Sequence, residues 1–195
     1  MRSVHLLAIE LCRFLEEEHI DYVLVGDACT PTSGSAQRIE LAIAPEFFPE
    51  LPLILHKFCH RNDSKLVTCM REQRQTWRCL LSALNREGRP EFVVLEIFGD
   101  LVRHGRLLLS ASELLAGRHV ESGQLRLRPA FFVAAPAMEF VYYLLRCVHD
   151  GELSEEQGHH LRDCWQRDPS GVARQIARFW DPSREGGVVV TAREG

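Results

Sequence analysis

The sequence predicts an α/β fold with a mixed sheet flanked by helices and a helical C-terminal part. Short β-branched and aromatic runs alternate with amphipathic segments of helical period along the first part of the chain. Three consecutive strand-like segments follow, over residues 64–73, 76–84 and 90–98. Beyond Asp100 the helical period becomes dominant. We therefore expect an α/β domain over 1–110, a helical part over 111–182 and a tail over 183–195.

The first expected helix begins after Ser3, which can cap it, and ends near Glu18. Apolar residues recur there at the three- and four-residue spacing that lines one helix face. Residues 22–25 then form a short strand that Gly26 closes. The Thr, Pro, Ser and Gly content of the next segment, to residue 37, predicts a loop because these residues favour turns.

Residues 38–43 alternate between apolar and charged side chains, which predicts a half-buried strand. Side chains two residues apart in a strand share a face. Ile39, Leu41 and Ile43 therefore form the buried face, while Arg38 and Glu40 lie together on the other one.

Pro45 can start the second helix, although Pro52 within its apolar stripe perturbs it and delays its true start. The strands at 64–73 and 76–84 are close enough in the chain to form a hairpin. The C-terminal part contains a short helix, a hairpin and amphipathic helices, expected at 112–116, through Gly117 and Gly123, from Ala135–Pro136, and over 153–166 and 170–180.

The composition excludes several classes of protein. With 46% hydrophobic residues, 26% charged residues and a net charge of −4, the 195-residue chain resembles an ordinary globular protein without the bulk positive charge expected of a nucleic-acid binder. No segment has the roughly 18 consecutive apolar residues that span a bilayer, so we expect no membrane partner. The seven cysteines form no C-x-x-C pair and mostly lie in apolar surroundings, which favours packed thiols in a reducing cytoplasm.

One constellation could support chemistry. Val25-Gly26-Asp27 closes the first strand, and Arg38-Ile39-Glu40-Leu41 opens the second after the intervening loop. Glu96, within Val94-Leu95-Glu96-Ile97, is a charged residue in an otherwise apolar strand expected beside the second. Carboxylates on one face of adjacent strands can hold divalent metals that bridge nucleotide phosphates.

This pattern resembles the polymerase-beta-like nucleotidyltransferase superfamily over roughly residues 5 to 150. The segments from Gly99 to Leu115 and at Pro136-Ala137-Met138-Glu139 are similar to bacterial members found with polysaccharide or sugar-transfer loci. The resemblance implies nucleotide binding by Gly26, Asp27, Ser35 and Arg38. It also implies catalytic and metal-binding roles for Glu40 and Glu96, with Mg²⁺ as the cofactor of an active member.

The sequence departs from the family pattern at two positions. Arg38 occupies the place of the first metal-binding carboxylate, and Asp27 occupies that of a Ser or Gly that contacts phosphate. A guanidinium has no lone pair to offer a metal and stays protonated at physiological pH. Arg38 could instead neutralise Glu40 and Glu96, so we expect their three side chains on one concave surface, with a guanidinium–carboxylate hydrogen bond.

Three functional hypotheses follow. The first is a catalytically degenerate nucleotidyltransferase-fold protein, a cytoplasmic pseudoenzyme that binds a nucleotide or a protein partner and requires no cofactor. The second is an active enzyme with Mg²⁺ on Glu40 and Glu96, acting on a sugar, small-molecule or protein acceptor. The third is a structural protein that self-associates through Val188-Val189-Val190, a segment that reads as either a tail or an edge strand.

The same residues also allow a purely structural interpretation. Arg38 and Glu40 could form a solvated strand face with no site, and Asp27 after Gly26 is typical of a turn. His56 and His60 are expected on an exposed helix face rather than at a metal. His149, His159, His160, Asp163 and Cys164 are likewise expected on the solvated sides of the C-terminal helices.

Overall fold

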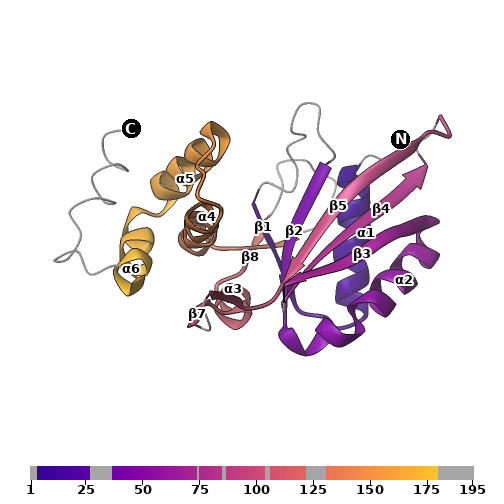
Figure 1. Cartoon of the computed structure of the whole chain (residues 1–195), viewed down its shortest axis with the longest axis horizontal. Coiled ribbons are helices and arrows are strands. Elements are labelled where there is room, and N and C mark those ends of the chain that lie inside the picture. Colours follow the sequence, from indigo (N-terminus) through magenta and orange to yellow (C-terminus); the bar gives the residue numbers. More distant parts are fainter. Residues whose placement is uncertain are drawn as a thin grey trace. The chain divides into compact units, whose positions relative to one another are not determined.

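The computed structural model describes residues 4–26, 37–73, 75–84, 87–103, 106–121 and 131–179 (Figure 1). The chain forms two compact units, Met1–Ala134 and Ala135–Gly195. The first is a mixed α/β unit built on a sheet, and the second is helical. The predicted fold class is therefore confirmed, including the mixed sheet and the helical C-terminal part.

Seven strands form the main sheet of the first unit, in the order β3-β4-β5-β2-β1-β9-β8. The sheet is mixed, because β2 pairs with β5 and β1 with β9 in parallel, whereas the other neighbours are antiparallel. The expected hairpin of β3 and β4 is present. The strands are β1 (Tyr22–Val25), β2 (Gln37–Ile43), β3 (Ser64–Gln73), β4 (Thr76–Leu84), β5 (Pro90–Phe98), β8 (His119–Glu121) and β9 (Phe131–Val133).

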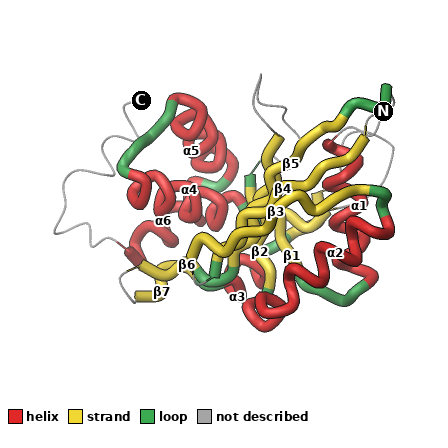
Figure 2. Tube along the Cα trace, turned by 45° about the vertical axis from the view of Figure 1, so that its right-hand side comes forward, coloured by secondary structure: helices red, strands yellow, loops and turns green. Residues whose placement is uncertain are grey.

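One face of this sheet is apolar and is covered by α1 (Val4–Glu17) and α2 (Leu51–Arg61) (Figure 2). The alternation of β2 explains the arrangement, since Ile39, Leu41 and Ile43 are all buried in the core with the apolar stripes of the two helices. The 3-10 turn η1 (Pro45–Glu50) precedes α2. The second helix therefore starts later than its first proline, as its sequence predicts.

Between β5 and β8 the chain forms a small two-stranded sheet of β6 (Leu101–Arg103) and β7 (Arg106–Leu109), followed by α3 (Ala111–Ala116). Ser110 caps α3 in a capping box with Glu113, which satisfies backbone donors at the helix start. The sequence predicts the helix but not the small sheet. Its strands are too short for the alternation of apolar and polar residues to be recognised.

The boundary between the units falls after Ala134, whereas the sequence changes character near residue 110. The difference arises because β9 pairs with β1 and β8 pairs with β9. This pairing keeps residues up to 134 in the sheet-containing unit.

The second unit consists of α4 (Pro136–Asp150), α5 (Glu155–Arg167) and α6 (Pro169–Phe179), close to the three predicted helices. Ser154 caps α5 in a capping box with Gln157. The rings of Phe140 and Trp165 contact each other between α4 and α5, with centroids 6.1 Å apart. In the part of the chain that is described, no helix combines the length and apolar character needed to cross a membrane.

The described cysteines fall into two groups. Among the described cysteines, Cys12, Cys59, Cys147 and Cys164 are buried thiols, and for Cys164 this differs from the solvated position expected from the sequence. Cys69 and Cys79 lie directly opposite each other on β3 and β4 and form a disulfide, which corrects the expectation of thiols alone. Strand pairing brings these two cysteines together, and their spacing in the sequence does not indicate it.

Substitution by alanine at two glycines of the helical unit should change its stability in opposite directions. Gly151 ends α4 with φ of 73°, a left-handed conformation, so Gly151→Ala should destabilise the unit by about 1 kcal/mol. Gly158 lies within α5, where an added Cβ meets nothing within 4 Å, so Gly158→Ala should stabilise it by about 0.5–1 kcal/mol. Thermal unfolding, followed by circular dichroism, measures both changes in stability. Changes of the same sign in the two variants would contradict the prediction.

Candidate functional site

The charged face of the sheet brings carboxylates from two strands together. Glu40 on β2 is paired in register with Glu96 on β5, and Arg78 on β4 is paired with Glu96 from the other side. Side chains at paired positions point to the same face of a sheet. Glu40 and Glu96 are only 8% and 4% exposed, so both acids have lost most of their contact with water.

Arg38 forms ion pairs with both acids. Its Nε lies 2.9 Å from Oε1 of Glu40, and its Nη2 forms an ion pair with Oε2 of Glu96. Arg38 and Glu40 are two residues apart in β2 and share a face, while the parallel register places Glu96 beside Glu40. Charge-assisted hydrogen bonds of this kind offset much of the cost of burying a carboxylate.

Arg78 extends this arrangement across a third strand. Its Nε and Nη2 donate to Oε1 of Glu96 at 2.9 and 2.6 Å. Its Nη1 lies 2.7 Å from Oε1 of Glu72 on β3. We call Glu40, Arg38, Glu96, Arg78 and Glu72 the charged network, in which each guanidinium lies between two carboxylates.

The sequence reasoning did not identify Arg78 or Glu72. Arg78 alternates with buried Cys79 and Leu81, which places it on the face opposite the core. That alternation could have indicated its side of β4. Nothing in the sequence, however, gives the β4–β5 register that sets Arg78 opposite Glu96.

The structure therefore brings together Arg38, Glu40 and Glu96, with the expected hydrogen bond between guanidinium and carboxylate. Gly26 follows β1 with φ of 84°, a left-handed conformation that favours glycine. Asp27 and Ser35 lie outside the described residues. The functional roles assigned to all these residues stay predictions, as does the concave shape of the surface around the three charged side chains.

The charged network also bears on metal binding. Mg²⁺ needs close, nearly octahedral oxygen ligands, and Glu40 and Glu96 supply oxygens from adjacent strands. The Arg38 guanidinium contacts an oxygen of each acid. A divalent cation that used these oxygens would have to displace Arg38, which cannot become neutral to make room.

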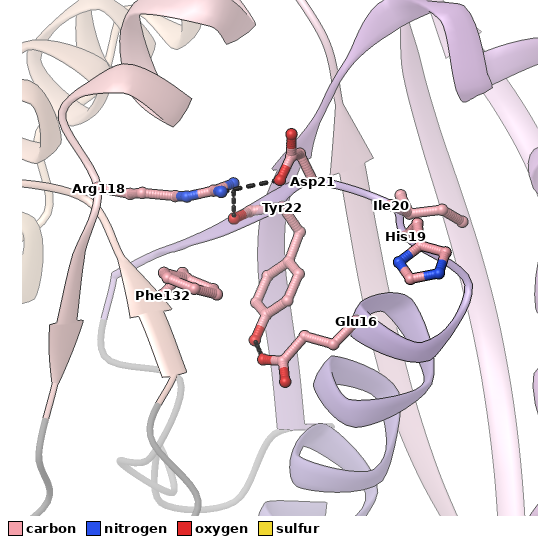
Figure 3. A pocket seen from close by; sticks show the side chains of 7 residues that line it. All are labelled: Glu16, His19, Ile20, Asp21, Tyr22, Arg118 and Phe132. Atoms are coloured by element: carbon pink, nitrogen blue, oxygen red, sulfur yellow. Dashed lines mark hydrogen bonds and ion pairs between the residues drawn. The ribbon is translucent and has the colours of Figure 1, made fainter.

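A cavity of about 260 Å³ lies elsewhere in the same unit, where α1 ends and β1 begins (Figure 3). Its polar groups mostly satisfy one another. Arg118 forms an ion pair with Asp21 at 2.8 Å and lies over the ring of Phe132, 4.4 Å from its centroid. Tyr22 donates its hydroxyl hydrogen to Glu16 at 2.9 Å.

These contacts tie the β8–β9 hairpin to β1. Arg118 precedes β8 and reaches Asp21 and the carbonyl oxygen of Tyr22, while Phe132 belongs to β9. The rings of Tyr22 and Phe132 also meet edge to face, with centroids 5.7 Å apart. We therefore interpret this cavity as part of the contact between the β8–β9 hairpin and β1.

No family model, curated protein or solved structure matches this chain. The resemblance to nucleotidyltransferases consequently stays a hypothesis that rests on the residues around Gly26, Arg38 and Glu96. The function has to be inferred from the side chains themselves.

Removal of Arg38 should lower the free energy of unfolding much more than removal of an exposed arginine that also has two acidic partners. Arg38→Ala leaves Glu40 and Glu96 buried without one of their cations and should destabilise the unit by about 1–3 kcal/mol. Arg61 contacts Glu17 and Glu18 at the surface, so Arg61→Ala should cost about 0–1 kcal/mol. Urea unfolding of both variants tests this, and equal losses would show that the charged network has no special energetic role.

The stability of this unit should also fall at alkaline pH because of Tyr22. Burial, followed by the nearby Cys12 and Glu16, raises the pKa of Tyr22 above its ordinary value of 10.0. Above pH 10.0 the unfolded phenol therefore releases its proton while the folded one retains it, which favours unfolding by about 1.4 kcal/mol per pH unit.

Tyr22→Phe removes this ionisation and should flatten the loss of stability above pH 10.0. Urea unfolding of the wild type and the variant across this pH range measures the difference. An identical pH dependence in the two proteins would refute the assignment to Tyr22.

Proposed function

We propose that this chain is a catalytically degenerate, nucleotidyltransferase-like binding or regulatory module whose ligand binding requires no metal. The observation that supports the proposal most directly is the position of Arg38, which contacts both Glu40 and Glu96. In the family that the sequence resembles, carboxylates at these positions hold the metal. Here a permanent cation already contacts both Glu40 and Glu96.

The exposed parts of the arginines suggest how such a module would bind a ligand. The side chains of Arg38 and Arg78 are 39% and 43% exposed although their partner Glu96 is buried. Each guanidinium has five N–H donors, and Arg38 uses Nε and Nη2 for its two acids. Donors that reach the surface could hydrogen-bond nucleotide phosphate directly, without a metal bridge.

A nucleotide ligand would fit the cytoplasmic location that we also propose. The Cys69–Cys79 disulfide argues against a cytoplasmic location, because disulfides are rare in reducing compartments. A protein partner remains compatible with either location. A nucleotide is still the ligand to test first, because the family resemblance implies nucleotide binding.

An active metal-dependent nucleotidyltransferase is the second candidate. It is favoured by the register of β2 and β5, which sets two buried acids side by side. This candidate requires Arg38 to move away so that Mg²⁺ can bind Glu40 and Glu96. The sugar, small-molecule or protein acceptor would then have to be found.

Calorimetric titration with ATP, GTP, CTP and UTP, each with and without Mg²⁺, separates the two candidates. The binding module should bind at least one nucleotide with the same affinity under both conditions. Binding that appears only with Mg²⁺ would support the enzyme instead. Failure of all four nucleotides to bind would reject the nucleotide version of the proposal.

A substitution at Arg38 tests the physical argument itself. Arg38→Asp replaces the cation by a third carboxylate beside Glu40 and Glu96, so the variant should gain a Mn²⁺ site that the wild type lacks. Electron paramagnetic resonance of added Mn²⁺ measures the bound fraction. Arg38→Gln is the matched control, because it removes the same cation but adds no acid.

The Mn²⁺ experiment has two informative failures. Mn²⁺ binding by the wild type that disappears in Glu40→Gln would show that Arg38 does not prevent metal binding. Arg38→Asp without a Mn²⁺ site, in a protein whose circular dichroism shows it to be folded, would show that these carboxylates are not arranged for a metal at all.

A further inference from the structure

A second group of polar side chains lies inside the helical unit, in a part of the chain that contributes no residue to the charged network. Glu139 belongs to the first turn of α4, and His160 and Cys164 belong to α5. One ligand atom of each residue lies within 4.8 Å of the other two. The group therefore combines a carboxylate oxygen, an imidazole nitrogen and a thiol sulfur from two helices.

The positions of these residues correct one expectation from the sequence. His160 and Cys164 were expected on the solvated side of α5, yet Cys164 is 0% exposed and the side chain of His160 is 22% exposed. Both face α4 because residues four apart share one helix face. Their neighbours His159 and Asp163 are exposed, as expected, and pair with Glu155 and Arg167 on α5 itself.

The contacts converge on one atom. Nε2 of His160 lies 3.1 Å from Oε1 of Glu139 and 3.6 Å from Sγ of Cys164. In a catalytic Cys–His–acid triad, the thiol and the acid contact different ring nitrogens. Here both contact the same nitrogen, which is the arrangement expected when three ligands surround a common centre.

The spacing also agrees with a zinc site. Bond lengths of about 2.0 Å to nitrogen and oxygen and about 2.3 Å to sulfur, at tetrahedral angles, place ligand atoms about 3.3–3.6 Å apart. The measured 3.1 and 3.6 Å lie close to these values. A set with thiolate and imidazole ligands favours Zn²⁺ over Mg²⁺ or Ca²⁺, which prefer oxygen.

The surroundings would hold the ligands in place. The ring of Tyr143 meets that of His160 edge to face, with centroids 4.5 Å apart, which limits rotation of the imidazole. Cys164 is fully buried, so its sulfur is held within the helical unit.

We propose that Glu139, His160 and Cys164 bind Zn²⁺ and that the ion links α4 to α5, with a water molecule as its fourth ligand. Binding would release the thiol proton and balance the buried carboxylate of Glu139. Because one ligand comes from α4 and two from α5, the ion would stabilise the packing of these helices. The proposal is independent of the nucleotidyltransferase hypothesis.

Cobalt titration of the full chain, with its Cys69–Cys79 disulfide intact, tests the proposal directly. One Co²⁺ per chain should bind and give the near-ultraviolet band of a thiolate-to-cobalt charge transfer. The band should disappear in Cys164→Ser. It should persist in Cys147→Ser, the matched control, which changes another buried thiol of the same unit.

Calorimetry with Zn²⁺ tests the other two ligands. Glu139→Gln and His160→Gln should each weaken binding at least tenfold, because each removes a ligand. His159→Gln should not, because the exposed His159 contacts Glu155 on α5 and does not belong to the ligand group. Circular dichroism establishes that each variant is folded.

Two results would overturn the proposal. The first is a wild-type protein that binds no Co²⁺ or Zn²⁺, or binds Co²⁺ without the thiolate band. The second is binding that His159→Gln weakens as much as His160→Gln does, which would indicate adventitious binding at the surface. The wild-type cobalt spectrum remains decisive even if Cys164→Ser does not fold.

Discussion

Two buried carboxylates at paired positions on adjacent strands impose the main constraint on this fold. Glu40 and Glu96 would repel each other and would be costly to bury unless a cation lay between them. Arg38 supplies that cation from β2, and Arg78 supplies a second one from β4. The charged network thus depends on the register of four strands, and a one-residue slip would turn its members to opposite faces.

The charged network and the group of Glu139, His160 and Cys164 differ in how their buried acids are balanced. In the charged network the cations are guanidinium groups, which remain charged and cannot leave without a large cost. In the helical unit, the buried carboxylate of Glu139 faces an imidazole and a thiol, neither of which carries a permanent positive charge. We propose that the first arrangement binds no added cation, whereas the second offers ligand atoms to one. The same physical rule, that buried charge must be compensated, leads to opposite inferences.

The sequence alone determined local features. The alternation in residues 38–43 placed Arg38 and Glu40 on one face, since the side-chain period of a strand is fixed by its backbone. Apolar spacing likewise located the main helices within a few residues. Glu96 stood out because a charge within an apolar strand needs a partner. The resemblance to a family supplied the idea that this strand lies beside the second.

Only the tertiary structure decided which distant residues meet. The register of β4 against β5 placed Arg78 beside Glu96, and the pairing of β9 with β1 kept the hairpin in the first unit. The packing of α4 on α5 turned Cys164 from an expected surface residue into a buried one beside Glu139. These contacts join residues far apart in the chain, and local periodicity specifies which face a residue occupies but not what packs against that face.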